Sequence, residues 1–225
     1  MNTKVSTVLI DADIMMYRAA WKHEGDDLDN AKETIDSMFE HLFYVTKCDS
    51  YIGFITGKGN FRKKIAATKP YKGNRKDMIM PEHLDAIKDY LIETWKCDVV
   101  TGLEADDALG ICQTEMENTC ICSIDKDLLQ IKGLHYNWNK SEFIEVTKYD
   151  AWQKLYEQTL SGDSTDNIVG IPRVGEKTAK KMLAECFSVE DAKNVSLNAY
   201  LNYYKDDNHL TMFKENYDLV KICIS

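Results

Sequence analysis

The chain contains 225 residues, 44% of them hydrophobic, and carries a formal net charge of −9. This length allows one sizeable core, or a main domain together with a small second one. No apolar run is long enough for a transmembrane helix, and the first apolar run meets acidic residues too early for a signal peptide. We therefore expect no membrane partner, and we also expect a monomer that lies in the cytoplasm.

The pattern of apolar residues predicts alternating strands and helices. A short β-branched run at 5–12 predicts a buried strand, and a helix is expected to begin near Asp13. Apolar residues recur at helical spacing in 27–47, which predicts an amphipathic helix. The later elements that we expect are strands at 51–56, 97–102, 119–124, 134–138 and 143–146 and helices at 81–95 and 104–117.

From about residue 148 the pattern is helical, with glycine-rich punctuation at 161–175. Strands that alternate with helices predict an α/β fold with a mainly parallel sheet. We therefore expect an α/β domain at 1–148 and a helical region at 149–225. In parallel sheets of this kind, binding sites form at the carboxyl ends of the strands.

Acidic residues gather at this predicted edge of the sheet. The nine clustered acids equal the whole acidic excess of the chain, and they are Asp11, Asp13, Glu104, Asp106, Asp107, Asp125, Asp127, Asp163 and Asp166. Each cluster taken alone is also typical of a helix cap or an Asx turn. Together, however, carboxylates repel one another unless cations neutralise them. Hard oxygen ligands without Cys or His favour Mg²⁺ or Mn²⁺, and two such ions can cleave a phosphodiester.

The scattered thiols and imidazoles point to no other site. Seven cysteines without a CxxC pair favour a reducing compartment over a disulfide framework. Five histidines without zinc-ligand spacing argue against zinc.

A basic segment contrasts with the acidic clusters. Residues 57–76 contain eight Lys or Arg and no acid, although the chain as a whole is acidic. A charge run of this kind can be a solvated loop. Here it carries Phe61 and Tyr71 and follows a strand of the acidic edge, so it can draw a phosphate backbone towards that edge.

A third motif, "GIPRVGEKTAKKML", occupies 170–183. Gly170 and Gly175 bracket a tight hairpin that opens a helix. The helix N-terminus offers backbone N–H groups to a phosphate, with Lys177, Lys180 and Lys181 close by. The alternative interpretation is a packing corner between two helices.

These motifs together resemble the flap endonuclease and 5′→3′ exonuclease family. The matching stretches are "LIDADIMMYRA", "FRKKIAATKPYKGNR", "GLEADDALG", "SIDKDLLQI" and "GDSTDNIVGIPRVGEKTAKKML", in family order over residues 8 to 183. The resemblance implies an α/β domain like those of PIN and 5′ nucleases, a basic arch at 57–80, and a helical "H3TH" module that binds duplex DNA. It also implies metal-dependent cleavage of DNA at 5′ ends, flaps or nicks, RNA-primed ends included, to give 5′-phosphate and 3′-hydroxyl ends.

The resemblance also implies residue roles. It assigns the first metal to Asp11, Glu104 and Asp106 and the second to Asp125, Asp127, Asp163 and Asp166. Asp107 would act directly or through water, and Lys72 and Arg75 would contact the scissile phosphate. Residues assigned to DNA contact are Arg62, Lys63, Tyr71, Gly170, Arg173, Gly175, Lys177 and Lys180. The cofactors implied are two Mg²⁺ or Mn²⁺ ions and a K⁺ ion at the hairpin.

The sequence departs from the family pattern at two positions. Thr56 stands at the end of the second strand, where the family usually has an Asp that binds the first metal. We hypothesise that Asp13 compensates for it. Arg173 stands where the family often has a hairpin glycine.

Two alternatives stay open. In one, Asp11 and Asp13 form the Asp-x-Asp motif of a haloacid-dehalogenase-type phosphatase, with Asp11 as a covalent nucleophile. That interpretation leaves the basic segment and the hairpin without a role. In the other, the chain is a structure-specific DNA-binding protein whose nuclease has decayed, as Thr56 would indicate.

Overall fold

The computed structural model describes residues 5–205 and 208–225. The chain divides into two compact units. The first, which we call the α/β unit, comprises 1–60, 79–146 and 223–225. The second, which we call the helical unit, comprises 61–78 and 147–222. The change from one unit to the other near residue 147 lies next to the predicted boundary, but most of the basic segment groups with the helical unit.

The α/β unit is built on a six-stranded sheet of order β3-β2-β1-β4-β5-β6. Its strands are β1 (Thr7–Asp11), β2 (Ser50–Thr56), β3 (Asp98–Val100), β4 (Thr119–Cys122), β5 (Gly133–Asn137) and β6 (Glu142–Val146). The pairs from β3 to β5 are parallel, and only β6 runs antiparallel, as the second strand of a hairpin with β5. The predicted α/β fold with a mainly parallel sheet is confirmed.

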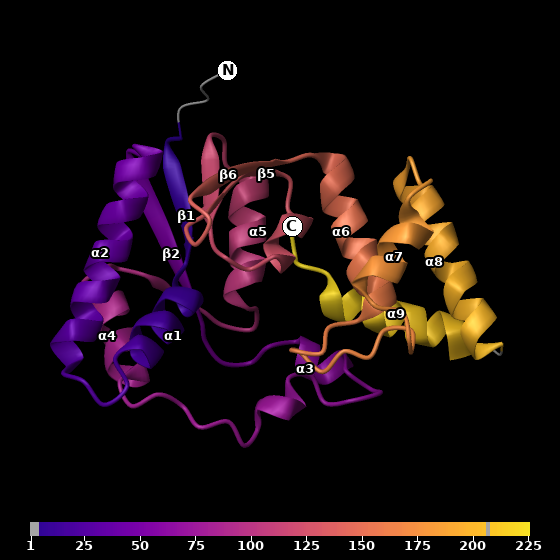
Figure 1. Ribbon diagram of the computed structural model, residues 1–225, viewed down its shortest axis with the longest axis horizontal. Helices are drawn as coiled ribbons and strands as arrows, with labels where there is room; N and C mark the ends of the chain where they lie inside the picture. Colours follow the sequence, from indigo (N-terminus) through magenta and orange to yellow (C-terminus); the bar gives the residue numbers. More distant parts are fainter. Residues whose placement is uncertain (1–4, 206–207) are drawn as a thin grey trace. The chain divides into compact units, whose positions relative to one another are not determined.

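Helices flank this sheet on both faces (Figure 1). They are α1 (Ala12–Lys22), α2 (Leu28–Thr46), α4 (Leu84–Glu93) and α5 (Ala105–Glu115), with the short 3₁₀ helix η2 (Asp127–Gln130). Helices α1, α2 and α4 pack on one another, whereas α5 packs on β1, β2, β3 and β4. All residues of β1 and β4 are buried. This burial explains their continuous apolar sequences, because a central parallel strand is covered on both faces.

The chain reverses its direction across the sheet between β1 and β4. From β1 it continues to β2 and β3 on one side, and from β4 to β5 on the other. Ile10 pairs with Cys122 in this register, which places Asp11 beside Ser123 at the carboxyl ends of the two strands. Such a reversal opens a crevice beyond the strand ends, where open α/β sheets bind their ligands.

The helical unit contains α3 (Arg62–Ile65), η1 (Gly73–Arg75), α6 (Lys148–Ser161), α7 (Glu176–Leu183), α8 (Val189–Tyr204) and α9 (Asn208–Val220). Its core is a separate cluster that includes Leu160, Leu183 and Tyr200. Helix α6 begins with a capping box between Thr147 and Asp150, which explains why the helical pattern starts there.

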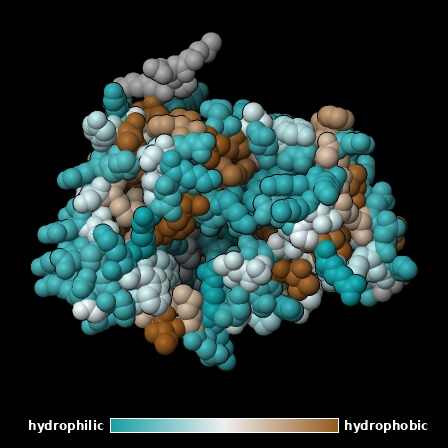
Figure 2. All heavy atoms as spheres, viewed as in Figure 1, coloured by the Kyte–Doolittle hydropathy of each residue, from teal (hydrophilic) through white to brown (hydrophobic). Residues whose placement is uncertain are grey.

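No helix among the described residues combines the length and apolar character that a membrane crossing requires. Hydrophilic side chains cover most of the face drawn in Figure 2, and the apolar ones lie in scattered groups.

Candidate active site

Asp11 lies at the carboxyl end of β1, where it is 2% exposed. Its Oδ1 accepts the backbone N–H of Ile14 at 3.2 Å and caps α1. Its Oδ2 accepts the hydroxyl of Ser123 at 2.7 Å. Burial raises the pKa of Asp11 from 3.8 to about 7; the Ser123 hydrogen bond opposes this rise, and the charges of Asp13 and Asp125 add to it. Asp11 is therefore a helix cap and also a buried carboxylate that neighbouring negative charges repel.

Ser123 connects this carboxylate to the next acidic cluster. Its hydroxyl oxygen accepts the backbone N–H of Asp125 at 2.9 Å, while its O–H donates a hydrogen bond to Asp11 Oδ2. Asp125 Oδ1 in turn accepts the backbone N–H of Asp127 at 2.8 Å. The turn after β4 is therefore held by the same side chains that carry the acidic groups. Ser123 was not among the predicted site residues; its place two residues before Asp125, directly after a strand, was the available signal.

Asp13 and Thr56 are in direct contact. The Asp13 carboxylate accepts the backbone N–H of Thr56 at 3.0 Å from Oδ1 and 3.2 Å from Oδ2. Thr56 Oγ1 accepts the backbone N–H of Ala105, the first residue of α5, at 2.9 Å. Thr56 therefore satisfies one of the open N–H groups at a helix N-terminus. The position where the family usually has an acid serves as a helix cap here, with the Asp13 carboxylate beside it.

The third acidic cluster opens α5. Asp107 is fully buried, and its Oδ2 accepts the backbone N–H of Glu104 at 3.0 Å. Its Oδ1 accepts the backbone N–H of Cys223 at 2.9 Å. Each oxygen of Asp107 is thus engaged by a backbone donor. Glu104 is buried and Asp106 is half-buried on the same turn.

The α/β unit supplies the donor chemistry of a divalent metal site. Burial raises the pKa of Asp11 most, the charges of Asp13 and Asp125 raise it further, and a cation would relieve the repulsion among these carboxylates. Within residues 5–205 and 208–225, however, no three His, Cys, Asp or Glu side chains are arranged as a ready ligand set. The hydrogen bonds explain this, because the oxygens of Asp11 and Asp107 face their own donors. The residues fit a metal in type, and several would have to exchange a hydrogen bond for it.

In the helical unit, Asp166 brings together three predicted site residues. Arg75 Nη2 donates to its Oδ1 at 2.7 Å, and the hydroxyl of Tyr71 donates to its Oδ2 at 2.7 Å. Lys72 Nζ lies 3.7 Å from Oδ2. The basic pair and the predicted second-metal acid therefore neutralise one another in this arrangement. Asp163 lies in the adjoining turn, where its Oδ1 accepts the backbone N–H of Thr165 at 2.7 Å.

Two residues expected to touch DNA lie inside the helical unit. Tyr71 is 6% exposed and packs with Ile168, Leu219 and Val220, so its ring would have to leave this cluster to stack on a base. Arg62 is 3% exposed; its Nε donates to Leu219 O at 3.0 Å and its Nη2 to Lys221 O at 2.6 Å. The physical reason is that the last carbonyls of α9 lack helical partners and take the guanidinium.

The hairpin depends on close backbone contact. Gly170 has φ +61°, and a Cβ there would lie 2.3 Å from the backbone N of Gly162. Arg173 has φ +69°, the left-handed region that suits glycine. Gly175 directly precedes α7, and a Cβ there would meet nothing within 4 Å. Gly170 is therefore required by packing, whereas Gly175 leaves open space before the helix.

The basic side chains differ in their partners. Lys180 lies 3.1 Å from Glu176 Oε1 and 3.7 Å from Glu157 Oε2. Lys63, Arg173, Lys177 and Lys181 are exposed, and no carboxylate of the described residues forms an ion pair with them.

Carboxylates at the reversal point of a parallel sheet define an α/β protein with an acidic site at its carboxyl edge. The family described as "5'-3' exonuclease, N-terminal resolvase-like domain" matches residues 6–158, and the chain belongs to this family. This membership decides against the phosphatase alternative.

Relatives of this chain named as exonucleases occur in a bacterium and in a phage. A 5′-3′ exonuclease of Buchnera aphidicola subsp. Acyrthosiphon pisum is 30% identical over 176 residues, which are 71% of this chain and 60% of the relative. An exodeoxyribonuclease of phage T3 is 29% identical over 199 residues, 80% of this chain and 64% of the relative. The chain thus spans less than two thirds of the length of these two relatives.

Solved structures show the same fold. A flap endonuclease of bacteriophage T5, crystallised with DNA and metal ions, has a TM-score of 0.67 at 17% identity, over 96% of this chain and 89% of that one. The catalytic core of Rad2 in complex with DNA substrate has a TM-score of 0.56 at 13% identity, over 98% of this chain and 75% of that one.

Proposed function

We propose that the protein is a structure-specific, divalent-metal-dependent 5′ nuclease that hydrolyses DNA to 5′-phosphate and 3′-hydroxyl ends. Its substrates would be 5′ ends, flaps or nicks, RNA-primed ends included, in the cytoplasm of a bacterium or a phage-infected cell, and it would act as a monomer. The observation that carries this proposal is the buried Asp11 at the reversal point of the sheet, whose pKa is raised by burial and, to a smaller extent, by the charges of Asp13 and Asp125.

The proposed ligands are the acids that the family pattern assigns. Asp11, Glu104 and Asp106, with Asp13 in place of an acid at Thr56, would hold one ion. Asp125, Asp127, Asp163 and Asp166 would hold a second. Mg²⁺ or Mn²⁺ would supply charge neutralisation and an activated water. The contact between Asp13 and Thr56 supports the proposal that the Asp13 carboxylate takes the role of the acid that the family usually has at position 56.

The remaining residues would position the DNA. Lys72 and Arg75 are paired with Asp166 in the helical unit, and we propose that a phosphate takes the place of that carboxylate on them. Asp107 would act directly or through a water, and its two oxygens also hold the start of α5 by accepting the backbone N–H groups of Glu104 and Cys223.

Duplex contact is assigned to the hairpin and its flanking cations. The open space at Gly175 supports a close approach of a phosphate to the N-terminus of α7, next to Lys177. Lys63, Arg173 and Lys180 would add charge along the backbone, and a K⁺ ion at the hairpin stays a prediction of the resemblance. The T5 flap endonuclease and the Rad2 core, both solved with DNA, support DNA as the partner.

The test is a cleavage assay with end-labelled blunt, nicked, 5′-flapped and RNA-primed duplexes, in Mg²⁺, in Mn²⁺ and in EDTA. We expect cleavage near 5′ ends with either metal and none in EDTA. Binding without cleavage under both metals would overturn the nuclease proposal in favour of the DNA-binding alternative. Binding should also weaken steeply as salt rises.

A further inference from the structure

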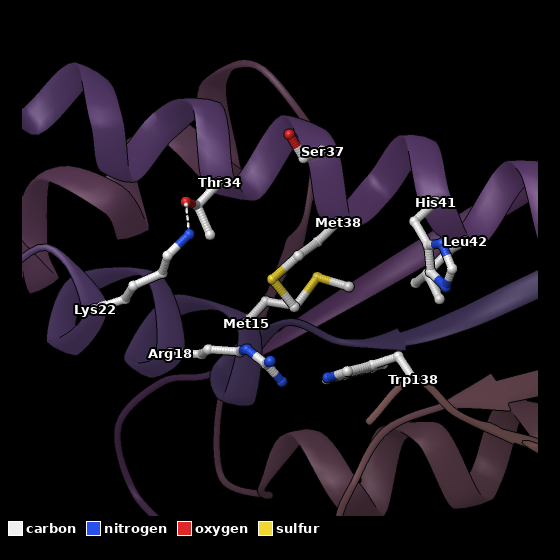
Figure 3. A pocket seen from close by; sticks show the side chains of 9 residues that line it. All are labelled: Met15, Arg18, Lys22, Thr34, Ser37, Met38, His41, Leu42 and Trp138. Carbon is white, nitrogen blue, oxygen red and sulfur yellow. Dashed lines mark hydrogen bonds between the residues drawn. The ribbon is translucent and has the colours of Figure 1, made fainter. Parts of the chain in front are cut away.

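A cavity of about 320 Å³ lies between α1 and α2 in the α/β unit (Figure 3). Its wall is completed by Trp138, which directly follows β5. This volume is at the lower end of the range for sites that bind small molecules. None of the proposed metal ligands or hairpin residues lines it.

The cavity is basic at one end. Arg18 and Lys22 of α1 line it, and none of its lining residues is acidic. Lys22 Nζ donates to Thr34 Oγ1 at 3.2 Å, and Arg18 Nη1 donates to Asn139 Oδ1. In the described part of the chain neither cation has a carboxylate within ion-pair distance. The two positive charges at this end of the cavity are therefore hydrogen-bonded to neutral side chains, and no carboxylate of the described residues balances them.

A buried donor points to the same place. The Nε1–H of Trp138 is buried and has no hydrogen-bond partner. Figure 3 shows this nitrogen and the guanidinium of Arg18 pointing towards one another. Two donors that face each other call for an acceptor between them, because an unmade hydrogen bond on a buried group costs free energy. An anionic oxygen would satisfy both.

The rest of the wall is apolar. Met15, Met38 and Leu42 line it, and Figure 3 shows the thioethers of Met15 and Met38 lying together between α1 and α2. Methionine side chains adapt to flat aromatic partners and make favourable sulfur contacts with them. The cavity therefore offers both a basic end that suits an anion and an apolar wall that suits a planar ring.

We propose that this cavity binds a nucleoside 5′-monophosphate, with the phosphate between Arg18 and the Trp138 N–H and the base against Met15 and Met38. The choice of ligand rests on the proposed function, because a nuclease that removes terminal nucleotides and leaves 5′-phosphates releases such molecules. The cavity would then be a product-binding site separate from the acidic edge.

The experiment follows the indole N–H signal of Trp138 by NMR in the full chain, with EDTA present. Deoxyadenosine 5′-monophosphate should shift this signal, and deoxyadenosine or inorganic phosphate should bind at least tenfold more weakly. Arg18→Ala should weaken nucleotide affinity at least tenfold. Lys32→Ala is the matched control, because Lys32 is a cation of α2 that pairs with Asp29 outside the cavity and should leave affinity unchanged.

Two outcomes would overturn the proposal: no shift of the Trp138 signal with the nucleotide, or inorganic phosphate binding as tightly, which would mean an adventitious anion only. Asp125→Asn separates this proposal from the nuclease proposal. It should abolish cleavage and keep the nucleotide-induced shift. A wild-type protein that shows the shift but never cleaves DNA would sink the nuclease proposal alone.

Discussion

Both carboxylate oxygens of Asp13 accept the backbone N–H of Thr56, at 3.0 and 3.2 Å. The residue that replaces a family acid is thus held by the neighbouring acid, and its hydroxyl caps α5 through Ala105. These two contacts of Thr56 join the end of β2 to the first turn of α1 and to the N-terminus of α5, beside Glu104 and Asp106. An acidic residue at position 56 would place a second negative charge beside the Asp13 carboxylate. The residue that is favourable at position 56 therefore depends on the residue at position 13.

Asp13→Asn tests whether the charge of Asp13 matters beyond this hydrogen bond. Asparagine keeps an acceptor for the Thr56 N–H, so the fold should be retained. We expect cleavage to fall by roughly 10- to 100-fold at low Mg²⁺, the usual range when a metal site loses a supporting group. The measurement is the cleavage rate as a function of Mg²⁺ concentration. An unchanged curve would leave Asp13 with a structural role only.

Ser123→Ala should change how Asp11 titrates. The Ser123 hydrogen bond lowers the pKa of Asp11 against the larger effect of burial, so its loss should move the pKa above the wild-type value of about 7. The folded pKa is higher than the unfolded one, so this group stabilises the metal-free fold at low pH, and that contribution is lost as pH rises from about 4 to 7.

Mg²⁺ competes with this proton, so its stabilising effect should grow as pH rises through 7. Thermal unfolding with and without Mg²⁺, together with a ¹³C carboxyl titration in EDTA, would measure both effects. A titration of Asp11 near its ordinary value of 3.8 in either protein would contradict the assignment.

Arg62 and Lys63 are adjacent and should behave in opposite ways. Arg62→Ala should lower the free energy of unfolding by roughly 2–3 kcal/mol, because carbonyls at the end of α9 lose a charged donor. Lys63→Ala should change stability by less than about 0.5 kcal/mol. It should instead weaken DNA binding and reduce by about 1 the slope of the logarithm of the binding constant against the logarithm of salt concentration. Equal effects on stability would refute this division.

Arg173→Gly should raise the free energy of unfolding by about 1 kcal/mol, because Arg173 occupies a left-handed conformation. Arg173→Ala is the control, since it removes the same charge and keeps the strain. Both variants should bind DNA more weakly if the charge contacts phosphate. Denaturant unfolding measures the effect on stability, and a binding titration measures the effect on DNA affinity. If the glycine variant is no more stable than the wild type, the backbone of Arg173 is not strained.

Local patterns in the sequence were sufficient for the strands and helices of the α/β unit. β1 begins and ends within two residues of the predicted run, because a buried β-branched stretch is a local signal. The basic segment was different. Tyr71 and Asp166 lie 95 residues apart in the sequence, and Arg62 and Leu219 lie 157 apart. No local pattern contains such pairings, so the resemblance could assign Arg62 and Tyr71 to DNA contact without any indication that both side chains are buried.

The sequence named the acidic residues of the proposed site, but it did not predict the hydrogen bonds that these residues make. Ser123 and the backbone N–H of Cys223 engage Asp11 and Asp107, and neither group carries charge or motif signal. The family pattern identifies the acidic residues, but only the structure shows which of their oxygens already accept hydrogen bonds.

Asp125→Asn tests whether the carboxylates after β4 bind a metal ion that cleaves DNA. Asparagine keeps the Oδ1 acceptor for the Asp127 N–H, so the turn after β4 should persist while one negative charge is lost. The measurement is single-turnover cleavage of a 5′-flapped duplex in Mg²⁺ beside a binding titration, with Glu145→Gln on the exposed β6 as the matched control. We expect Asp125→Asn to lower the cleavage rate by orders of magnitude while DNA binding is kept or strengthened, and Glu145→Gln to change neither. Wild-type cleavage by Asp125→Asn, or a large loss of DNA binding, would contradict this expectation.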